Sequence, residues 1–392
     1  KNILYQNNGD GSFSEQTESP VAELSLSSVD AAWGDYDGDS YLDLLIANRD
    51  HANELFHNNG DGTFARIDTG VIVTNNRSSI TPSWIDIDED GDLDLYITNT
   101  FSGNNFLYIN HCSGFFTRND TSKISTDGKH GSSPSWADYD NDGDLDLFVS
   151  NTNTEPGENN ALYRNDGNGN FTQLTNIPPV VDRGVSAGST WGDIDNDGDL
   201  DLVVANGEHI GARKNFIYLN KGMDVFERLS DEPAVEELAQ SDGITLVDWD
   251  ADGALELFVA NRDRNSSAYD NNSTGNWLKI NLIGTTSNRS AIGSIIRTKA
   301  NISGQDIWQM RLLSSNAGRR SANGLIQHFG MGDATMIDSL ILEWPSGLVE
   351  TYTGVEINQI LTLTEGTAAA IGKNESDLHA PASFRLYQNY PN

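Results

Sequence analysis

Hydrophobic positions in this chain fall in short runs rather than with helical spacing. The segment Leu145-Asp146-Leu147-Phe148-Val149 is typical, because it is rich in strand-forming residues and lies between a Gly and an Asn. Such runs predict short β-strands. Helical periodicity is nearly absent, and residues 236–239 are expected to form at most one short turn. The pattern therefore predicts an all-β protein.

These runs belong to a unit that recurs along the chain. The stretch WGDYDGDSYLDLLIAN at 33–48 returns at 84–99, 136–151, 191–206 and 247–261, with steps of 51, 52, 55 and 55 residues between the first acids. A second element, NELFHNNGDGTF at 53–64, returns at 105–116, 160–171 and 215–226, and a copy opens the chain at 2–13. Its centre of Asn, Asp and Gly predicts a hairpin, because these residues tolerate positive φ.

Four short strands in a unit of about 50 residues are the signature of a β-propeller blade. A β-solenoid is the alternative, but its repeats are shorter. We therefore expect a β-propeller built from four-stranded repeats over residues 1–272, in which residues 1–17 form the outer hairpin of a truncated blade. The tryptophans that precede the acidic stretches are expected to pack between blades rather than to bind carbohydrate: Trp33, Trp84, Trp136 and Trp191, with Trp249 displaced in the fifth unit.

Each acidic stretch has the spacing of a calcium-binding loop. In residues 138–146, acids at positions 1, 3 and 5 converge if the chain winds tightly, and Gly143 at position 6 permits the turn. Position 7 offers its carbonyl, and Asp146 at position 9 can close the shell. Hard oxygen ligands alone select Ca²⁺ over zinc, copper or Mg²⁺. The predicted ligands are Asp35, Asp37, Asp39, Tyr41 and Asp43; Asp86, Asp88, Asp90, Asp92 and Asp94; Asp138, Asp140, Asp142, Asp144 and Asp146; Asp193, Asp195, Asp197, Asp199 and Asp201; and Asp248, Asp250, Asp252, Ala254 and Glu256.

Two other interpretations of these loops are an EF-hand and an acidic turn that binds nothing. An EF-hand requires a Glu at position 12, where this chain has only Ile or Val. Five carboxylate clusters without a cation would repel severely. We therefore expect up to five calcium sites. The first and fifth are expected to be the weakest, because Ser40 replaces Gly in one and Ala254 and Glu256 replace Asp in the other.

The composition narrows the choice of partners and location. The 58 acidic and 24 basic residues give a net charge of −34, and the five acidic stretches hold 24 of the acids and no Lys or Arg. Such a protein is repelled by nucleic acid, and the chain has no apolar run long enough for membrane insertion. One Cys excludes a disulfide framework and a cysteine-based zinc site. Calcium-filled loops of this kind favour an extracellular location.

The repeats resemble the FG-GAP/VCBS repeats of integrin-type propellers, whose DxDxDGxxD loop binds calcium. The resemblance covers about residues 1–272 and implies that side chains at positions 1, 3, 5 and 9 and the carbonyl at position 7 are ligands. Such propellers usually close with seven or so blades, whereas this chain supplies five loops and one leading hairpin.

From Asn276 the chain is neutral, with 7 acids and 7 bases in residues 276–366. Strand patterns at 277–282, 295–298, 307–311 and 339–344 predict a small β-sandwich with one wet face. The strings NWLKINLIG, SNRSAIG (287–293), HFGMG (328–332) and WPSG (344–347) resemble an ASPIC/UnbV domain, which follows VCBS propellers in acidic secreted proteins of the cartilage acidic protein type. That resemblance implies no catalytic residues. The candidates for a polar site are Arg289, Arg319, Arg320 and His328, although each also fits a structural role in a loop or strand.

The C-terminal residues divide into a linker and a segment that resembles a secretion signal. Residues 367–380 are small and polar, as in a linker. Residues 381–392 resemble the start of a type IX secretion sorting tail, because FRLYQNYPN matches an F-x-L-x-QNYPNP string. The resemblance implies a secreted or surface protein of a bacterium related to the Bacteroidetes. Since the chain starts at a Lys without a signal peptide pattern and stops within this string, we expect both ends to be truncated.

Two functions from different classes fit these observations. The first is a non-enzymatic module, expected to be a monomer, that binds an extracellular protein or polysaccharide. The second is a calcium-dependent polysaccharide lyase on a propeller scaffold. A lyase requires a basic, aromatic-lined cleft and a Tyr, His or Lys base. The acidic propeller argues against it, and only Lys214, Arg213 and His209 form a small basic cluster.

Overall fold

The structure is a computed structural model that describes residues 1–23, 25–75, 78–100, 103–152, 157–207, 211–316, 318–319 and 324–367. Arg320, His209, the predicted sorting tail at 381–392 and all but the first residue of the predicted linker lie outside the described residues. The described part is nearly all β, as predicted. Among the described residues, no helix has the length and hydrophobicity needed to cross a bilayer.

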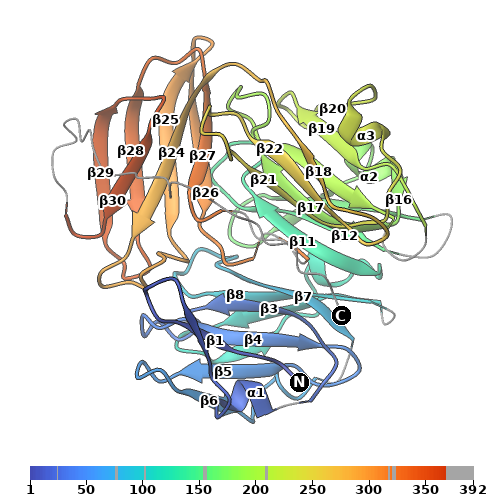
Figure 1. Ribbon diagram of the computed structural model, residues 1–392, viewed down its shortest axis with the longest axis vertical. Coiled ribbons are helices and arrows are strands. Elements are labelled where there is room, and N and C mark those ends of the chain that lie inside the picture. Colours follow the sequence, from blue (N-terminus) through green and yellow to red (C-terminus); the bar gives the residue numbers. More distant parts are fainter. Residues whose placement is uncertain are drawn as a thin grey trace.

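Four antiparallel sheets of four strands follow one another along the chain, and we call them blades 1 to 4 (Figure 1). Blade 1 contains β3 (Ser28–Gly34), β4 (Asp43–Asn48), β5 (Glu54–Asn58) and β6 (Phe64–Ile67). Blade 2 contains β7 (Ser79–Ile85), β8 (Asp94–Asn99), β9 (Phe106–Asn110) and β10 (Phe116–Arg118). Blade 3 contains β11 (Gly131–Ala137), β12 (Asp146–Asn151), β14 (Ala161–Asn165) and β15 (Phe171–Leu174). Blade 4 contains β17 (Ser186–Gly192), β18 (Asp201–Asn206), β19 (Phe216–Asn220) and β20 (Phe226–Arg228).

Smaller elements flank these blades. Blade 5 has three strands, β21 (Ser241–Val247), β22 (Glu256–Asn261) and β23 (Ser267–Tyr269), and the leading hairpin has two, β1 (Tyr5–Asn7) and β2 (Phe13–Glu15). β13 (Glu158–Asn159) pairs with β16 (Arg183–Gly184). The helical turns are α1 (Pro20–Glu23), η1 (Lys123–Ser125), α2 (Pro178–Val181) and α3 (Pro233–Glu236). The turn expected at 236–239 instead ends at Glu236, because Pro233 starts it.

Consecutive blades pack through their inner strands β3, β7, β11, β17 and β21. The Trp84 ring of blade 2 stacks on Tyr36 of the first acidic loop at a centroid distance of 5.9 Å. Trp191 stacks on Tyr139 in the same way at 5.7 Å. The prediction that these tryptophans pack between blades is confirmed for both, whereas Trp249 of blade 5 is 43% exposed.

The C-terminal part forms two packed sheets, the predicted sandwich. One contains β24 (Asn276–Ile283), β27 (Gln327–Gly332) and β30 (Ile360–Thr364), and the other β25 (Ile295–Ile302), β26 (Gln305–Leu312), β28 (Ile337–Glu343) and β29 (Val349–Val355). Their core includes Leu278, Phe329, Leu340 and Leu342. β30 pairs with β24 in parallel, which local patterns could not indicate.

The two parts touch along the described residues that follow β26, 313–316 and 318–319. Ser315 exchanges hydrogen bonds with the backbone of Trp33 on β3, and Asn316 donates to the carbonyl of Pro82 on β7. The Arg319 N–H donates to Ser133 on β11. The segment therefore contacts the inner strands of three blades. Figure 1 shows the resulting arrangement, with β24 to β30 at the upper left, β3 to β8 below and β17 to β22 at the upper right.

Candidate metal sites

Each acidic loop, numbered 1 to 5 in chain order, winds through left-handed backbone at positions 4 and 6. Loop 3 shows the pattern, with φ of 59° at Asn141 and 100° at Gly143. Position 4 is Gly38, Glu89, Asn141, Asn196 and Ala251, and position 6 is Ser40, Gly91, Gly143, Gly198 and Gly253, all with positive φ. Gly and Asn adopt this conformation most readily. The predicted tight winding is thus the backbone geometry of all five loops.

Carboxylates at positions 1 and 5 hold this winding in place. Asp193 at position 1 accepts hydrogen bonds from the N–H groups of Asp197 and Gly198, at 3.0 and 2.8 Å. Asp197 at position 5 accepts from the N–H of Asp199 at 3.0 Å. The other loops repeat one or both of these contacts. Each carboxylate oxygen keeps further acceptor capacity beyond these bonds.

The acid at position 9 fastens the loop to the hairpin of the same blade. Asp146 accepts from the N–H of Tyr139 at 3.1 Å and from the N–H of Asn165 at 2.8 Å. The Asn165 amide also donates to the carbonyl of Leu145. Asp43, Asp94 and Asp201 make the same pair of bonds, with Asn58, Asn110 and Asn220 as hairpin partners. These asparagines were missed as site residues, although their fixed place in the hairpin repeat was a signal.

The acid at position 3 shows whether the loops suit a bound calcium ion. In loops 1 to 4 the Oδ1 atoms of Asp37, Asp88, Asp140 and Asp195 are buried without a hydrogen-bond partner. In the same loops, carboxylate oxygens converge within 4.8 Å in the groups Asp35–Asp37–Asp39, Asp86–Asp88–Asp90, Asp138–Asp140–Asp146 and Asp193–Asp195–Asp197. Buried acceptors of this kind need a donor or a cation. All-oxygen donors at this spacing fit Ca²⁺.

The electrostatics of the loops point the same way. Burial, with the neighbouring Asp140, raises the pKa of Asp146 to about 9. Burial and Asp197 raise the pKa of Asp193 to about 8, and burial raises that of Asp94 to about 7. Carboxylates packed so closely favour a positive charge between them, which a divalent cation supplies.

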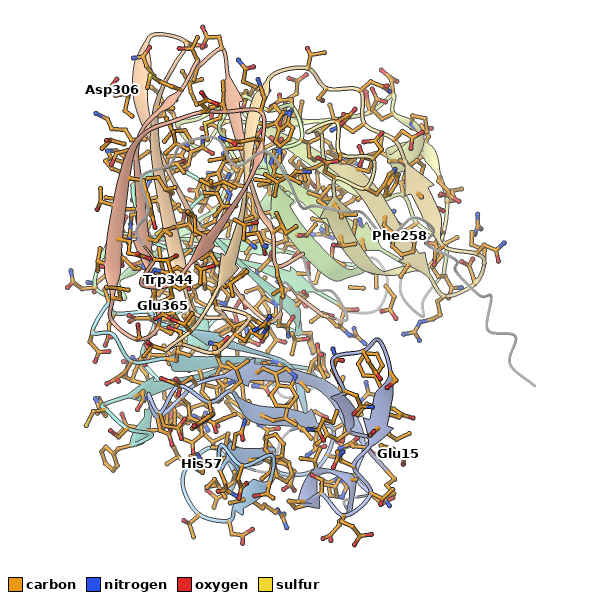
Figure 2. All side chains as sticks on the ribbon, turned by 60° about the vertical axis from the view of Figure 1, so that its left-hand side comes forward. Glu15, His57, Phe258, Asp306, Trp344 and Glu365 are labelled. Carbon is orange, nitrogen blue, oxygen red and sulfur yellow. The ribbon has the colours of Figure 1, made fainter. Side chains whose placement is uncertain are left out.

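Loops 1, 4 and 5 each have a basic side chain against their acids, and loops 1 and 5 are the two that depart in sequence. In loop 1, His57 Nδ1 lies 3.1 Å from Asp37 and 3.3 Å from Asp43, and Figure 2 shows His57 at the lower edge of the molecule. In loop 5, Lys279 of β24 forms an ion pair with Asp248 at position 1. Lys279 was not among the predicted site residues.

The predicted polar candidates of the C-terminal part do not form one site. Arg289 is exposed, and Arg319 is 2% exposed and donates from Nη1 to Ser132 of blade 3. His328 contacts the carbonyl of Gly253 in loop 5, with Nε2 at 3.0 Å. Burial lowers the pKa of His328 to about 4, so its neutral ring donates that bond from Nε2. Arg319 and His328 therefore tie the C-terminal part to blade 3 and to loop 5.

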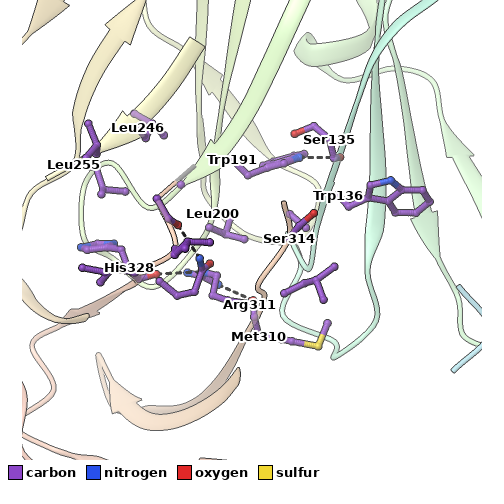
Figure 3. Close-up of a pocket in the computed structure, with 18 of the residues that line it drawn as sticks. Ser135, Trp136, Trp191, Leu200, Leu246, Leu255, Met310, Arg311, Ser314 and His328 are labelled. Atoms are coloured by element: carbon purple, nitrogen blue, oxygen red, sulfur yellow. Dashed lines mark hydrogen bonds between the residues drawn. The ribbon is translucent and has the colours of Figure 1, made fainter. Parts of the chain in front are cut away.

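A cavity of about 330 Å³ lies where the C-terminal part meets the blades, and Figure 3 shows its lining. Trp136 and Trp191 line one side, and Met310, Arg311 and His328 line the other. Arg311 is buried, which lowers its pKa to about 10, and it donates to the carbonyls of His328 and Met310. Its charge faces Asp193 and Asp138, the position 1 acids of loops 4 and 3.

Comparison with known families matches residues 1–46, 35–97, 86–149 and 150–204 to the FG-GAP-like repeat. These matches span more than half of the 392 residues. The chain belongs to the FG-GAP repeat family. Residues 284–370 of this FG-GAP repeat protein match the ASPIC and UnbV domain. The FG-GAP resemblance is thus confirmed for residues 1–204 and the ASPIC/UnbV resemblance for residues 284–370.

The protein is homologous to cartilage acidic protein 1. It is 24% identical over 314 residues to the Xenopus tropicalis protein, covering 76% of this chain and 46% of the relative. The corresponding human protein is 23% identical over 317 residues, with coverages of 76% and 45%. The chain spans about half the length of the curated relatives it matches.

Solved structures show weaker similarity to this FG-GAP repeat protein. An Agrocybe aegerita lectin that recognises non-reducing terminal N-acetylglucosamine has a TM-score of 0.45 and 16% identity, over 69% of this chain and 75% of that one. The Photorhabdus luminescens Tc holotoxin pore has a TM-score of 0.40 and 15% identity, over 87% of this chain and 18% of that one.

Proposed function

We propose that this FG-GAP repeat protein is a secreted, calcium-stabilised binding module for an extracellular protein or polysaccharide, acting as a monomer and without catalysis. The observation that carries the proposal is the buried, unpartnered carboxylate oxygen at position 3 in four successive loops. The same unpartnered oxygen at the same position of each repeat is what we expect if each loop binds the same ion. The residues at positions 1, 3, 5 and 9 and the carbonyl at position 7 would hold the ion.

Calcium in this role acts on stability. The ion would supply positive charge to carboxylates that the fold has already brought together. With a Kd of ~0.1–1 mM and ~1 mM free calcium, each filled site adds about 0.4–1.4 kcal/mol. Four sites then add roughly 2–6 kcal/mol, comparable with the stability of a whole domain.

Thermal unfolding with and without a calcium chelator tests this part of the proposal. We expect chelation to lower Tm and added calcium, but not magnesium, to restore it. The Asp140→Asn variant should lose about a quarter of the calcium-dependent shift, because one of four sites is weakened. Asp231→Asn, at an exposed position outside the loops, is the matched control and should keep the full shift. Equal melting with calcium and with chelator would contradict the proposal.

The ligand surface is proposed on blade 4. A hollow of about 210 Å³ there is bordered by four cationic side chains, Arg183, Arg213, Lys214 and Arg228, and by one acid, Asp182, in a protein of net charge −34. Arg228 also covers the Phe216 ring at 4.2 Å. Guanidinium and aromatic groups together suit an acidic saccharide or an acidic peptide segment. A glycan array on the calcium-loaded protein, repeated with Arg228→Ala, tests this surface.

The second candidate function, a lyase, rests on the same hollow. Cationic groups that hold a uronate would be one requirement of lyase chemistry, and a base is the other. Turnover of uronate polymers in a lyase assay would favour this alternative over a binding module. Binding without turnover is the result that we expect.

Secretion is supported by the string at 384–392, which resembles a type IX sorting tail. An exterior location also agrees with the millimolar calcium that sites of this class need. The proposed location is therefore secreted or cell-surface, in a bacterium related to the Bacteroidetes.

A further inference from the structure

Loop 5 has a buried cation of its own. Lys279 Nζ forms an ion pair with Asp248 Oδ2, and the two side chains are only 7% and 1% exposed. Asp248 is the position 1 acid, whose counterparts in the other loops are predicted calcium ligands. We propose that loop 5 is not a calcium site and that the Lys279 ammonium occupies its cation position, which makes the loop a docking site for the C-terminal domain. Only the expected number of ions rests on the proposed calcium function.

The C-terminal domain closes loop 5 from one side. A Cβ on Gly253 would lie 1.9 Å from the Trp277 indole nitrogen, so the loop backbone and this ring are in close contact. His328 Nε2 donates to the Gly253 carbonyl at 3.0 Å. Trp277 and Lys279 lie on β24. His328 lies on β27, where it is the strand partner of Lys279. One sheet of the domain therefore places all three side chains on the loop.

The basic side chains that pair directly with acids of loops 1 and 4 are placed differently. Lys221 lies 2.8 Å from Asp195 in loop 4, but its side chain is 36% exposed. His57 at loop 1 is 27% exposed. Both side chains are partly exposed to solvent. Lys279 is buried between Asp248 and the Trp277 ring, 5.0 Å away.

The ligands of loop 5 also differ from those of loops 1 to 4. The position 3 acid of loop 5, Asp250, is exposed, whereas each of its counterparts has a buried oxygen without a hydrogen-bond partner. A divalent ion beside the fixed ammonium would meet like charge at a few Å, where repulsion is strong. The two departures at Ala254 and Glu256 accompany a loop in which a fixed ammonium already pairs with one of the four acids.

The docking surface extends to loop 4. A Cβ on Gly330 would lie 1.9 Å from Asp193 Oδ2 and 2.7 Å from Asn196 Cα. The Gly332 N–H donates to the Asn196 carbonyl at 2.8 Å. The HFGMG string at 328–332 therefore lies along loops 4 and 5, and its glycines permit the close approach.

Counting calcium ions in the full chain tests the inference. Metal-free wild type, Lys279→Met and Lys299→Met would be dialysed to equilibrium against calcium and analysed for bound metal. Lys299 is the matched control, since it pairs with Asp306 at the surface of the same domain. We expect four ions in wild type and in Lys299→Met. Lys279→Met should bind a fifth ion, because the methionine keeps the aliphatic stem and removes the charge. Adding Asp248→Asn to Lys279→Met should return the count to four, which assigns the fifth ion to loop 5.

Hydrogen exchange in chelator gives a readout that needs no calcium. Amides 248–256 should exchange at least several-fold faster in Lys279→Met than in wild type, and at an unchanged rate in Lys299→Met. Five ions in wild type, or unchanged exchange in Lys279→Met, would overturn the inference while leaving the calcium sites of loops 1 to 4 intact. If no variant binds calcium, the proposed calcium function fails, and the exchange rates still decide whether Lys279 docks the domain.

Discussion

At the scale of single residues, the acidic loops depend on two positions that must adopt left-handed backbone. Position 6 is Gly in four loops and Ser40 in loop 1, where φ is 75°. A side chain in this conformation costs roughly 1–2 kcal/mol relative to Gly. The replacement of Gly by Ser40 at position 6 was therefore recognisable from the sequence. Its effect is backbone strain rather than the loss of a ligand.

Replacing Ser40 with Gly should stabilise the protein. We expect about 1 kcal/mol in the free energy of unfolding, because the strain at φ 75° is released. Ser40→Ala is the control, since it removes the hydroxyl but keeps the Cβ. Denaturant titration of the three proteins measures the change, and equal stability of Ser40→Gly and Ser40→Ala would contradict the explanation.

Glu365 is a second residue with a defined energetic role. Its oxygens accept hydrogen bonds from the N–H groups of Thr285, Thr286 and Ser287 at 2.8 Å and from the hydroxyls of Ser287 and Ser346. It thereby joins the SNRSAIG and WPSG motifs through Ser287 and Ser346. Burial raises the pKa of Glu365, but these hydrogen bonds outweigh it and lower the pKa to about 2.

The low pKa of Glu365 predicts a pH dependence of stability. The folded-state pKa lies below the unfolded value of about 4.3, so the contribution is complete above that pH and disappears as pH falls toward 2. The stability difference between wild type and Glu365→Gln should therefore shrink between about pH 5 and pH 2. Denaturant titrations across that range measure it, with the exposed Glu356→Gln as control. A difference that stays constant with pH would contradict the role.

At the scale of elements, the hairpin repeat acts differently in a complete and an incomplete blade. Phe56 on β5 is fully buried in a cluster with Val21 of α1 and with Leu44 and Ile46 of the neighbouring strand β4. Tyr5 holds the same place in the leading hairpin and is 54% exposed, since β1 pairs with β2 alone in the described sheet. The same local sequence thus contributes to a core only when its neighbouring strands are present.

Truncating the two aromatic residues should have unequal effects. Phe56→Ala should destabilise blade 1 by about 3–5 kcal/mol through the cavity it leaves. Tyr5→Ala should change stability by no more than about 0.5 kcal/mol in this chain. Denaturant unfolding of both variants gives the comparison. A large loss in Tyr5→Ala would mean that the hairpin is covered in solution.

At the scale of the whole molecule, the C-terminal domain stabilises the arrangement of the blades through contacts with their acidic loops and inner strands. Arg311 faces the first acids of loops 3 and 4, and Ser315, Asn316 and Arg319 bond to the inner strands of three blades. Contacts on this scale join residues more than 180 positions apart in sequence. The described domain and blades therefore form one contiguous structure.

Gly330 is the position where that contact should be most sensitive. Gly330→Ala places a Cβ 2.7 Å from the Asn196 backbone, which cannot move without shifting loop 4. We expect a loss of about 1–3 kcal/mol in the free energy of unfolding. Gly324→Ala is the control, because the nearest atom to its added Cβ is 3.9 Å away. Equal stability of the two variants would show that the domain does not press on loop 4.

The sequence by itself determined the repeat, the strands, the winding of the loops and their predicted ligands. These features depend on residues a few positions apart, such as Gly143 and the alternating acids around it, so local spacing carries them. Only the tertiary structure decided which acidic loops have a basic side chain beside them and that β30 lies parallel to β24. It also decided that Arg311 and Lys279 lie near the position 1 acids of the loops. The local sequence around a Lys or Arg in a strand does not indicate which distant acid it will pair with, because the pair forms only when the C-terminal domain packs against the blades.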